Sequence, residues 1–311
     1  KLARLTSRDL LLHRSGLPGW LPVHHATYSD YARHVLNQKY FTTAASASQG
    51  ENVVAVGPGL YGTPALGKLV DQKLKQTEIR RSGRFRYSDV GFLLLGRVLE
   101  SVSGKTLDQL SAYLFYRSMG MSRTGFNPHR WGLGYACPPT EIDQRWRKTT
   151  IKGYVHDPTA ACLGGVAGHA GLFSNSYDLA KLMLMLKNGG NYGGRQYLRP
   201  ETIQSFTRKQ SRQSHRGLGW DKPNTLSSAH RPISQFASAS TYGHTGFTGT
   251  CMWVDPVKDL AFVFLSNRTY PNVGNRKLQQ EHVREKIMDQ VYLSLQMEEH
   301  PVMANQAQVK P

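Results

Sequence analysis

A polar, glycine-rich stretch at residues 242–249 holds one of two sets of side chains suited to chemistry. His244 and Thr245 offer hydrogen-bond donors, and Gly246 lets a ligand approach the backbone because glycine has no Cβ. Phe247 follows them directly. The residues alone leave two interpretations open: a strand that binds a ligand, or a segment that only turns the chain.

The second set lies around Ser88, where Tyr87 and Asp89 precede the apolar run 90–99. Ser88 or Asp89 is a natural N-cap for a helix over this run. Tyr87 would then lie just before a helix N-terminus, where free N–H groups and the positive end of the dipole gather. Plain capping, with Tyr87 packed as an ordinary aromatic residue, explains the same pattern.

The elements that must position these residues are helices, long loops and a late antiparallel sheet. Two β-prone runs, 250–255 and 260–265, are joined by a short turn and predict a hairpin. The amphipathic run 178–186 predicts a helix, and residues 218–220 predict the start of another strand. This order is typical of an α+β protein whose antiparallel sheet is covered by helices.

The two ends of the chain and its small-residue segments give further expectations. Thr6 and Asp9 form a capping-box pattern that opens a short helix. Residues 45–65 and 136–174 are rich in turn formers, and we expect loops there. Residues 278–297 predict a terminal helix, and its apolar face carries four residues at helical spacing. They are Val283, Ile287, Val291 and Leu295.

Composition limits the classes of function. The chain has 311 residues and a net charge of +18, but its 39 basic residues are spread out rather than clustered, which does not favour nucleic-acid binding. No apolar run reaches 18 residues, so no membrane span is predicted. Three widely spaced cysteines predict neither a disulfide framework nor a zinc site.

We expect no metal and no cofactor. His156, Asp157 and His169 could ligate a metal in principle, but their spacing matches no metal-binding pattern, and a structural role is expected for them.

Taken together, four stretches resemble the serine β-lactamase and penicillin-binding-protein superfamily, on its class C-like branch of peptidases, esterases and β-lactamases. The matching stretches are residues 11–18 (LLHRSGLP), 87–89 (YSD), 164–174 (GGVAGHAGLFS) and 244–246 (HTG). The resemblance implies an α+β fold in which an antiparallel sheet is flanked by helices, beside a helical region. It also implies one such domain over residues 1–297, with a C-terminal tail at 298–311.

The superfamily's nucleophile is the serine of a Ser-x-x-Lys motif, and this chain contains no such motif. Ser205 has Arg208 where the lysine is needed, and it lies far downstream of the nucleophile's place in the superfamily. That motif precedes the LLxHxSGLP element by tens of residues, whereas ten residues precede Leu11 here. We therefore expect an upstream segment of the same protein to carry the nucleophile and the first sheet strands.

The resemblance also implies roles for the two sets of side chains. Tyr87 would share proton transfer with the lysine, and nearby cations would lower its pKa. Asp89 stands where the superfamily has asparagine, and an ionised carboxylate can only accept hydrogen bonds. His244, Thr245 and Gly246 would bind a substrate carboxylate from the sheet edge, and the N–H of Phe247 would form half of an oxyanion hole.

Two functions remain open at this point. The first is acyl transfer on a D-amino-acid peptide, an ester or a β-lactam, by an enzyme of the bacterial cell envelope or periplasm. The second is a non-catalytic domain that binds cell-wall peptide, or an accessory domain of a larger envelope protein. The absent Ser-x-x-Lys and the aspartate at residue 89 are the observations that favour the second.

Overall fold

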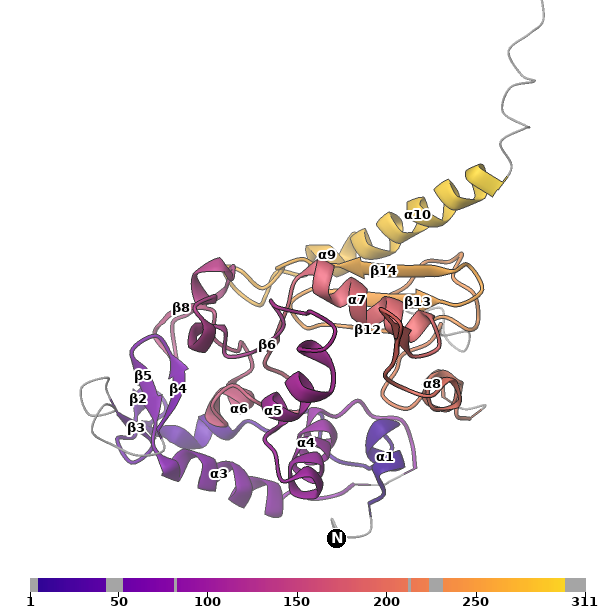
Figure 1. Ribbon diagram of the computed structural model, residues 1–311. Helices are drawn as coiled ribbons and strands as arrows, with labels where there is room; N and C mark the ends of the chain where they lie inside the picture. The colour runs from indigo at the N-terminus through magenta and orange to yellow at the C-terminus, as the bar shows by residue number, and fades with distance from the viewer. Residues whose placement is uncertain (1–4, 43–52, 81–82, 212–213, 224–231, 300–311) are drawn as a thin grey trace, which may run out of the picture.

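The computed structural model describes residues 5–42, 53–80, 83–211, 214–223 and 232–299. Its first half forms a region dominated by helices, and its last part forms a small sheet with helices packed on it (Figure 1). The fold is therefore of the mixed α+β type, as the sequence predicts.

The helices are mostly short, and several begin at a capping residue. In α4, Ser88 is the N-cap and Gly104 closes the helix in the left-handed region at φ 66°. The α-helices are α1 Ser7–Leu11, α3 Pro64–Lys75, α4 Asp89–Ser103, α5 Leu107–Ser111, α6 Pro158–Cys162, α7 Ser176–Lys187, α8 Pro200–Thr207, α9 Lys277–Gln280 and α10 Val283–Glu299. Shorter helical turns are η2 Val23–Thr27, η3 Ala112–Tyr116, η4 Pro128–Trp131 and η5 Gly134–Ala136.

The strands form two three-stranded sheets and four two-stranded ribbons within the described residues. The sheets have the orders β3-β5-β4 and β12-β13-β14, and the ribbons are β1-β2, β6-β9, β7-β8 and β10-β11. Their bounds are β1 Tyr28–Asp30, β2 Val35–Leu36, β3 Phe41–Thr42, β4 Val54–Gly57, β5 Leu60–Gly62, β6 Gly125–Phe126, β7 Pro139–Asp143, β8 Thr149–Lys152, β9 Leu172–Phe173, β10 Asn191–Tyr192, β11 Arg195–Gln196, β12 Tyr242–Thr245, β13 Cys251–Asp255 and β14 Leu260–Phe264.

The late sheet contains the predicted hairpin. β13 pairs antiparallel with β14, with Trp253 opposite Phe262. β12 is a separate strand that pairs with β13, with His244 opposite Met252. The His-Thr-Gly segment therefore lies at the end of its own strand, on the outer side of this sheet.

Alternating side chains cover the two faces of this sheet. On β13, Val254 packs in one core with Met183 of α7, while Trp253 packs in another with Met288 and Tyr292 of α10. Each face therefore has its own helix, and Figure 1 shows α7 and α10 against the sheet. These two cores fix the position of β12.

A third core joins the helices of the first half. Leu10 of α1, Val90 and Leu93 of α4, and Leu66 of α3 are buried in it together with α6. The predicted capping box is confirmed, because Thr6 Oγ1 accepts from Asp9 N and the Asp9 carboxylate accepts from Thr6 N, both at 3.1 Å. This core supports the loop that carries Tyr87.

Several local expectations are wrong. The loop expected at 45–65 contains β4, β5 and the start of α3, and residues 43–52 lie outside the described part. The loop expected at 136–174 contains the β7-β8 ribbon and α6. Both errors share a cause: short strands and small-residue helices carry too little apolar periodicity to be distinguished from turns.

The predictions for residues 218–220 and for the terminal helix also need correction. Isolated bridges of Asp221 to Arg216 and to Gly243 replace the expected strand. The terminal helix is interrupted between α9 and α10, and Ile287 is exposed while Met288 and Tyr292 are buried. The side of α10 that packs against the sheet carries Met288 and Tyr292.

Candidate active site

The loop before α4 is held in place by the segment that follows α1. Ser88 Oγ accepts from Gly91 N at 3.2 Å and donates to the Pro18 carbonyl at 2.6 Å. Asp89 N donates to the Gly19 carbonyl at 2.8 Å. The sequence around Pro18 therefore serves to anchor the helix N-terminus beside which Tyr87 lies.

His13 is the centre of this anchor. Its Nδ1 accepts from Ser88 N at 3.0 Å, so the neutral ring carries its hydrogen on Nε2. Burial, and then the charge of Arg216, lower the pKa of His13 to about 3, which keeps the ring neutral. The ring packs against Tyr87 at 4.3 Å and Phe92 at 5.1 Å between centroids.

The fold brings the two predicted sets of side chains together. The Tyr87 ring lies 6.1 Å from the His244 ring, centroid to centroid, although the two residues belong to opposite parts of the chain. His244 Nδ1 donates to the Thr245 carbonyl at 2.8 Å. Tyr87 is 46% exposed, so the face between the N-terminus of α4 and the end of β12 is open to solvent.

A tight turn follows β12 and presents Phe247. Gly246 N donates to the Thr250 carbonyl at 2.7 Å, and Gly249 N donates to the Gly246 carbonyl at 3.0 Å. Gly249 has φ 108°, a conformation that a residue with a Cβ rarely adopts. The turn therefore requires glycine for its shape.

Two residues from other elements hold the Phe247 side chain and backbone. The ring stacks on His156 at 5.5 Å, and the Arg268 guanidinium lies 4.7 Å from its centroid. Arg268 Nε also donates to the Phe247 carbonyl at 2.9 Å. Phe247 is 63% exposed despite these contacts, so its ring faces the open side of the turn.

The electrostatics of Tyr87 differ from the expectation. The pKa of Tyr87 is raised to about 12 by burial, then by the charge of Asp89 and, to a smaller degree, by that of Asp221, against the opposing charge of Arg216. The nearby cation Arg216 acts in the predicted direction, but desolvation and the two carboxylates outweigh it; the effect of a lysine from an upstream segment stays a prediction.

Asp89 is perturbed as well. Burial raises the pKa of Asp89 to about 6. The charge of His169 opposes this rise and that of Asp157 adds to it. Between its usual value and about pH 6, Asp89 is therefore largely protonated, and it can then donate a hydrogen bond as well as accept one.

Two charged residues beside His244, Arg216 and Asp221, were not among the predicted site residues. Arg216 is buried and forms an ion pair with Asp221, whose Oδ2 lies 3.7 Å from His244 Nε2. The backbone of Asp221 also pairs with Gly243, at 2.8 and 3.0 Å, and so covers the outer edge of β12 at that point. The sequence did contain a pattern that could have indicated them, since two charged residues flank the apolar residues 217–220.

The histidines considered as metal ligands have the structural partners that were expected. His156 Nε2 bonds to Glu141 at 2.9 Å, and His169 Nε2 bonds to Asp157 at 2.9 Å. Asp157 also caps α6 through Ala160 N. Across the described ranges, no group of three or more acidic, histidine or cysteine side chains could hold a metal ion.

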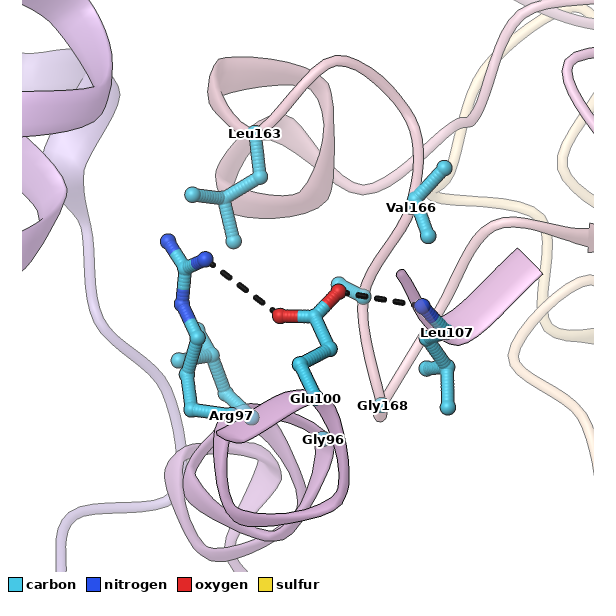
Figure 2. A pocket seen from close by; sticks show the side chains of 9 residues that line it. Gly96, Arg97, Glu100, Leu107, Leu163, Val166 and Gly168 are labelled. Carbon is cyan, nitrogen blue, oxygen red and sulfur yellow. Dashed lines mark hydrogen bonds and ion pairs between the residues drawn. The ribbon is translucent and has the colours of Figure 1, made fainter. Parts of the chain in front are cut away.

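A small pocket lies between α4, α5 and the loop before β9, apart from the candidate residues (Figure 2). Glu100 spans it, bonding to Arg97 at 3.4 Å and accepting from Leu107 N at 3.1 Å. Gly168 lies against Gly96 at its base. The pocket is thus a packing gap behind the loop that carries His169.

No helix in the described ranges is both long and apolar enough to cross a bilayer.

Comparison with known proteins identifies the family from the sequence. Residues 2–283 match the model of the Beta-lactamase family. A protein of Salmonella gallinarum named "Putative D-alanyl-D-alanine carboxypeptidase" is 37% identical over 236 residues, which are 68% of this chain and 54% of that protein. An Escherichia coli K12 protein of the same name is 37% identical over 233 residues, with 71% and 54% covered. The chain thus spans about half the length of the curated relatives it matches.

Solved structures share the fold at low identity. A penicillin-binding protein homologue from Caulobacter crescentus has a TM-score of 0.57 and 17% identity, over 93% of this chain and 71% of that one. The D-amino acid amidase of Ochrobactrum anthropi has a TM-score of 0.55 and 16% identity, over 94% and 78%. With the family match covering nearly the whole chain, this protein belongs to the Beta-lactamase family.

Proposed function

We propose that the protein is a serine hydrolase of the β-lactamase and penicillin-binding-protein type. It would transfer an acyl group from a D-amino-acid peptide, an ester or a β-lactam, through a covalent intermediate, to water. The observation that carries this proposal is the approach of Tyr87 to His244, at 6.1 Å, beside the N-terminus of α4. The names of the curated relatives favour a D-alanine peptide among the three substrates.

In this proposal the nucleophile comes from a Ser-x-x-Lys motif in a part of the protein that precedes Lys1. Tyr87 and that lysine would take the proton of the serine hydroxyl and return it to the leaving group. The pKa of about 12 means that Tyr87 works as a base only if a further positive charge lies close to it. The lysine of the motif would supply that charge.

The end of β12 would hold the substrate. His244 and Thr245 would bind its carboxylate or polar tail, and Gly246 would let its backbone approach. The N–H of Phe247 would stabilise the oxyanion, a contribution that is worth about 10²–10³ in rate when such a donor is removed.

The proposal extends to the whole protein. Residues 1–297 would form one β-lactamase-like domain together with an upstream segment, and residues 298–311 a tail. Its substrate would be a small molecule or a cell-wall peptide, and its place the bacterial cell envelope or periplasm. Support for that place comes from the family and from the names of the relatives.

The test uses the full encoded protein, including any residues that its gene adds before Lys1. We expect a fluorescent penicillin or a fluorophosphonate to label it covalently. Tyr87→Phe should slow labelling about 100-fold or more, because positioned general bases contribute about 10²–10⁴. Tyr31→Phe is the control, since Tyr31 is an exposed tyrosine in the loop between β1 and β2.

The alternative function is a non-catalytic domain that binds cell-wall peptide. The absence of Ser-x-x-Lys from these 311 residues is the observation that favours it. If the gene encodes no such motif upstream and neither reagent forms an adduct, the binding-domain function is favoured over the enzyme.

A further inference from the structure

The turn that follows β12 is held by one arginine from the segment after β14. Arg268 Nε donates to the Phe247 carbonyl at 2.9 Å, and Arg268 N donates to the Thr248 carbonyl at 2.9 Å. The guanidinium also lies 4.7 Å from the centroid of the Phe247 ring. Arg268 therefore contacts this turn through its backbone, its Nε and its guanidinium group.

The direction of the Phe247 N–H follows from the peptide that contains it. The Gly246 carbonyl accepts from Gly249 N at 3.0 Å, inside the turn. Because the 246–247 peptide bond is trans, its N–H points away from its carbonyl, and therefore away from Gly249. The N–H of Phe247 has no acceptor within the described ranges of the chain. This donor can therefore serve an oxyanion.

The peptide on the other side of Phe247 is the one that Arg268 fixes. Two peptide planes that meet at a Cα rotate about φ and ψ only, so holding both planes sets the direction of the N–H between them. Gly249 holds the plane before Phe247, and Arg268 Nε holds the plane after it. Without the Arg268 side chain, the backbone bond from Arg268 to Thr248 is what remains on that side.

Arg268 is itself fixed by a loop. Its Nη1 donates to the carbonyls of Val273 and Asn275, at 3.1 and 3.0 Å. That loop is closed by Gly274 N, which donates to Asn272 Oδ1 at 2.9 Å. The planar guanidinium spans the turn and the loop because its donors have a fixed geometry, which a lysine ammonium does not have. The Arg268 side chain therefore ties the turn to this loop.

We propose that Arg268 is a positioning residue for the oxyanion hole, because by holding the Phe247 carbonyl it keeps the N–H of Phe247 aimed at the oxyanion of the substrate. The inference rests on the proposed function, in which that N–H stabilises the developing negative charge. Arg268 acts through the backbone of Phe247 and touches no reacting atom. A rotated donor loses its effect, since hydrogen bonds weaken steeply as their angle falls.

Pre-steady-state kinetics of the full encoded protein with a chromogenic ester or β-lactam test this role. They give the rate constant of acylation separately from the dissociation constant of the substrate. Arg268→Lys keeps the charge but loses the fork of donors. We expect its acylation rate constant to fall about 10- to 100-fold, because loss of a whole oxyanion donor costs about 10²–10³. The dissociation constant should change by less than about threefold.

Arg195→Lys is the matched control. Arg195 is exposed on β11, and its guanidinium lies 5.0 Å from the centroid of the Tyr197 ring. The control therefore makes the same change at an arginine–aromatic contact that involves none of the candidate site residues, and it should leave acylation unchanged. The inference is overturned if Arg268→Lys acylates as fast as this control, or if its whole loss lies in the dissociation constant.

The acyl carbonyl gives a spectroscopic readout that a loss of stability alone would not change. Hydrogen bonds from an oxyanion hole polarise this carbonyl and lower its infrared stretching frequency. In the acylated Arg268→Lys protein, we expect the carbonyl band at a higher frequency than in the acylated original. An unchanged frequency overturns the inference.

Amide hydrogen exchange separates the inference from the proposed function, because it needs no substrate. The Gly249 N–H closes the turn on the Gly246 carbonyl, so its protection reports whether the turn is held. We expect this hydrogen to exchange about tenfold faster in Arg268→Lys, and at the original rate in Arg195→Lys. Equal rates in all three proteins overturn the inference even if an acyl adduct forms. If the original protein forms no adduct, the proposed function fails, whereas faster exchange in Arg268→Lys still supports the hold of Arg268 on the turn.

Discussion

Among single residues, two carboxylates raise the pKa of Tyr87. Asp89 lies at the start of α4, and Asp221 lies at the outer edge of β12, where its backbone pairs with Gly243. Arg216 compensates Asp221 through a buried ion pair. Removing one member of such a pair costs about 3–5 kcal/mol, because the other charge is left buried. The site is therefore sensitive to changes that look conservative in the sequence.

Asp89 makes the stability of the protein depend on pH. Its pKa is raised from the ordinary value of 3.8 to about 6 in the folded protein, so the fold favours the protonated carboxyl. The contribution of Asp89 to the free energy of unfolding is therefore fully present below about pH 4 and is lost as the pH rises through 6. Asp89→Asn removes the cost of burying the charge. We expect the free energy of unfolding of this variant, relative to that of the original protein, to be about 1–3 kcal/mol higher at pH 7.5 than at pH 4.

Thermal denaturation at both pH values measures this change. Asp71→Asn, on the exposed side of α3, is the reference for removing a carboxylate. An equal pH dependence in the Asp89→Asn protein and the original would contradict the assigned shift.

At the scale of the element, one serine fixes the start of α4. Ser88 Oγ bonds to the Gly91 N–H and to the Pro18 carbonyl, and both partners are in the frame around Tyr87. The loop after α1 and the first turn of α4 therefore move together. This contact gives residues 11–18 a structural role, because Pro18 accepts the hydrogen bond that anchors the start of α4.

Ser88→Ala tests this frame. We expect a loss of about 1–2 kcal/mol in the free energy of unfolding, because a cap is lost and the Pro18 carbonyl loses its donor. Chemical denaturation measures it. Ser103→Ala near the other end of α4 is the matched control, since its Oγ bonds to the Leu99 carbonyl in an exposed position. Equal losses in the two variants would show that the cap has no special weight.

At the scale of the whole molecule, the net charge of +18 is the most unusual property. The basic residues are spread along the chain, so few of them can contact one stretch of phosphates together. We expect binding to random duplex DNA at low salt only, with no complex at about 150 mM salt. Fluorescence anisotropy against salt concentration measures this, and a micromolar complex that persists at that salt would speak for a nucleic-acid function.

Local sequence patterns were sufficient to predict several individual elements of this protein. The Thr6 and Asp9 capping box, the Ser88 cap, the α7 helix and the β13-β14 hairpin depend on neighbours in the chain, and all are confirmed. Short strands such as β4 and β7 were missed, because their pairing partners, not their own residues, make them strands. The face of α10 was misjudged for the same reason, since the sheet decides which side is buried.

The amino-acid pattern alone was enough to predict the family motifs, the helix N-terminus beside Tyr87 and the glycine-rich segment that contains β12. The fold was needed to bring Tyr87 to His244 and to place the Arg216–Asp221 ion pair beside His244. These contacts depend on distance and burial, which arise only once separate cores hold α4 and β12 in their places. A charge pattern along the chain contains neither quantity.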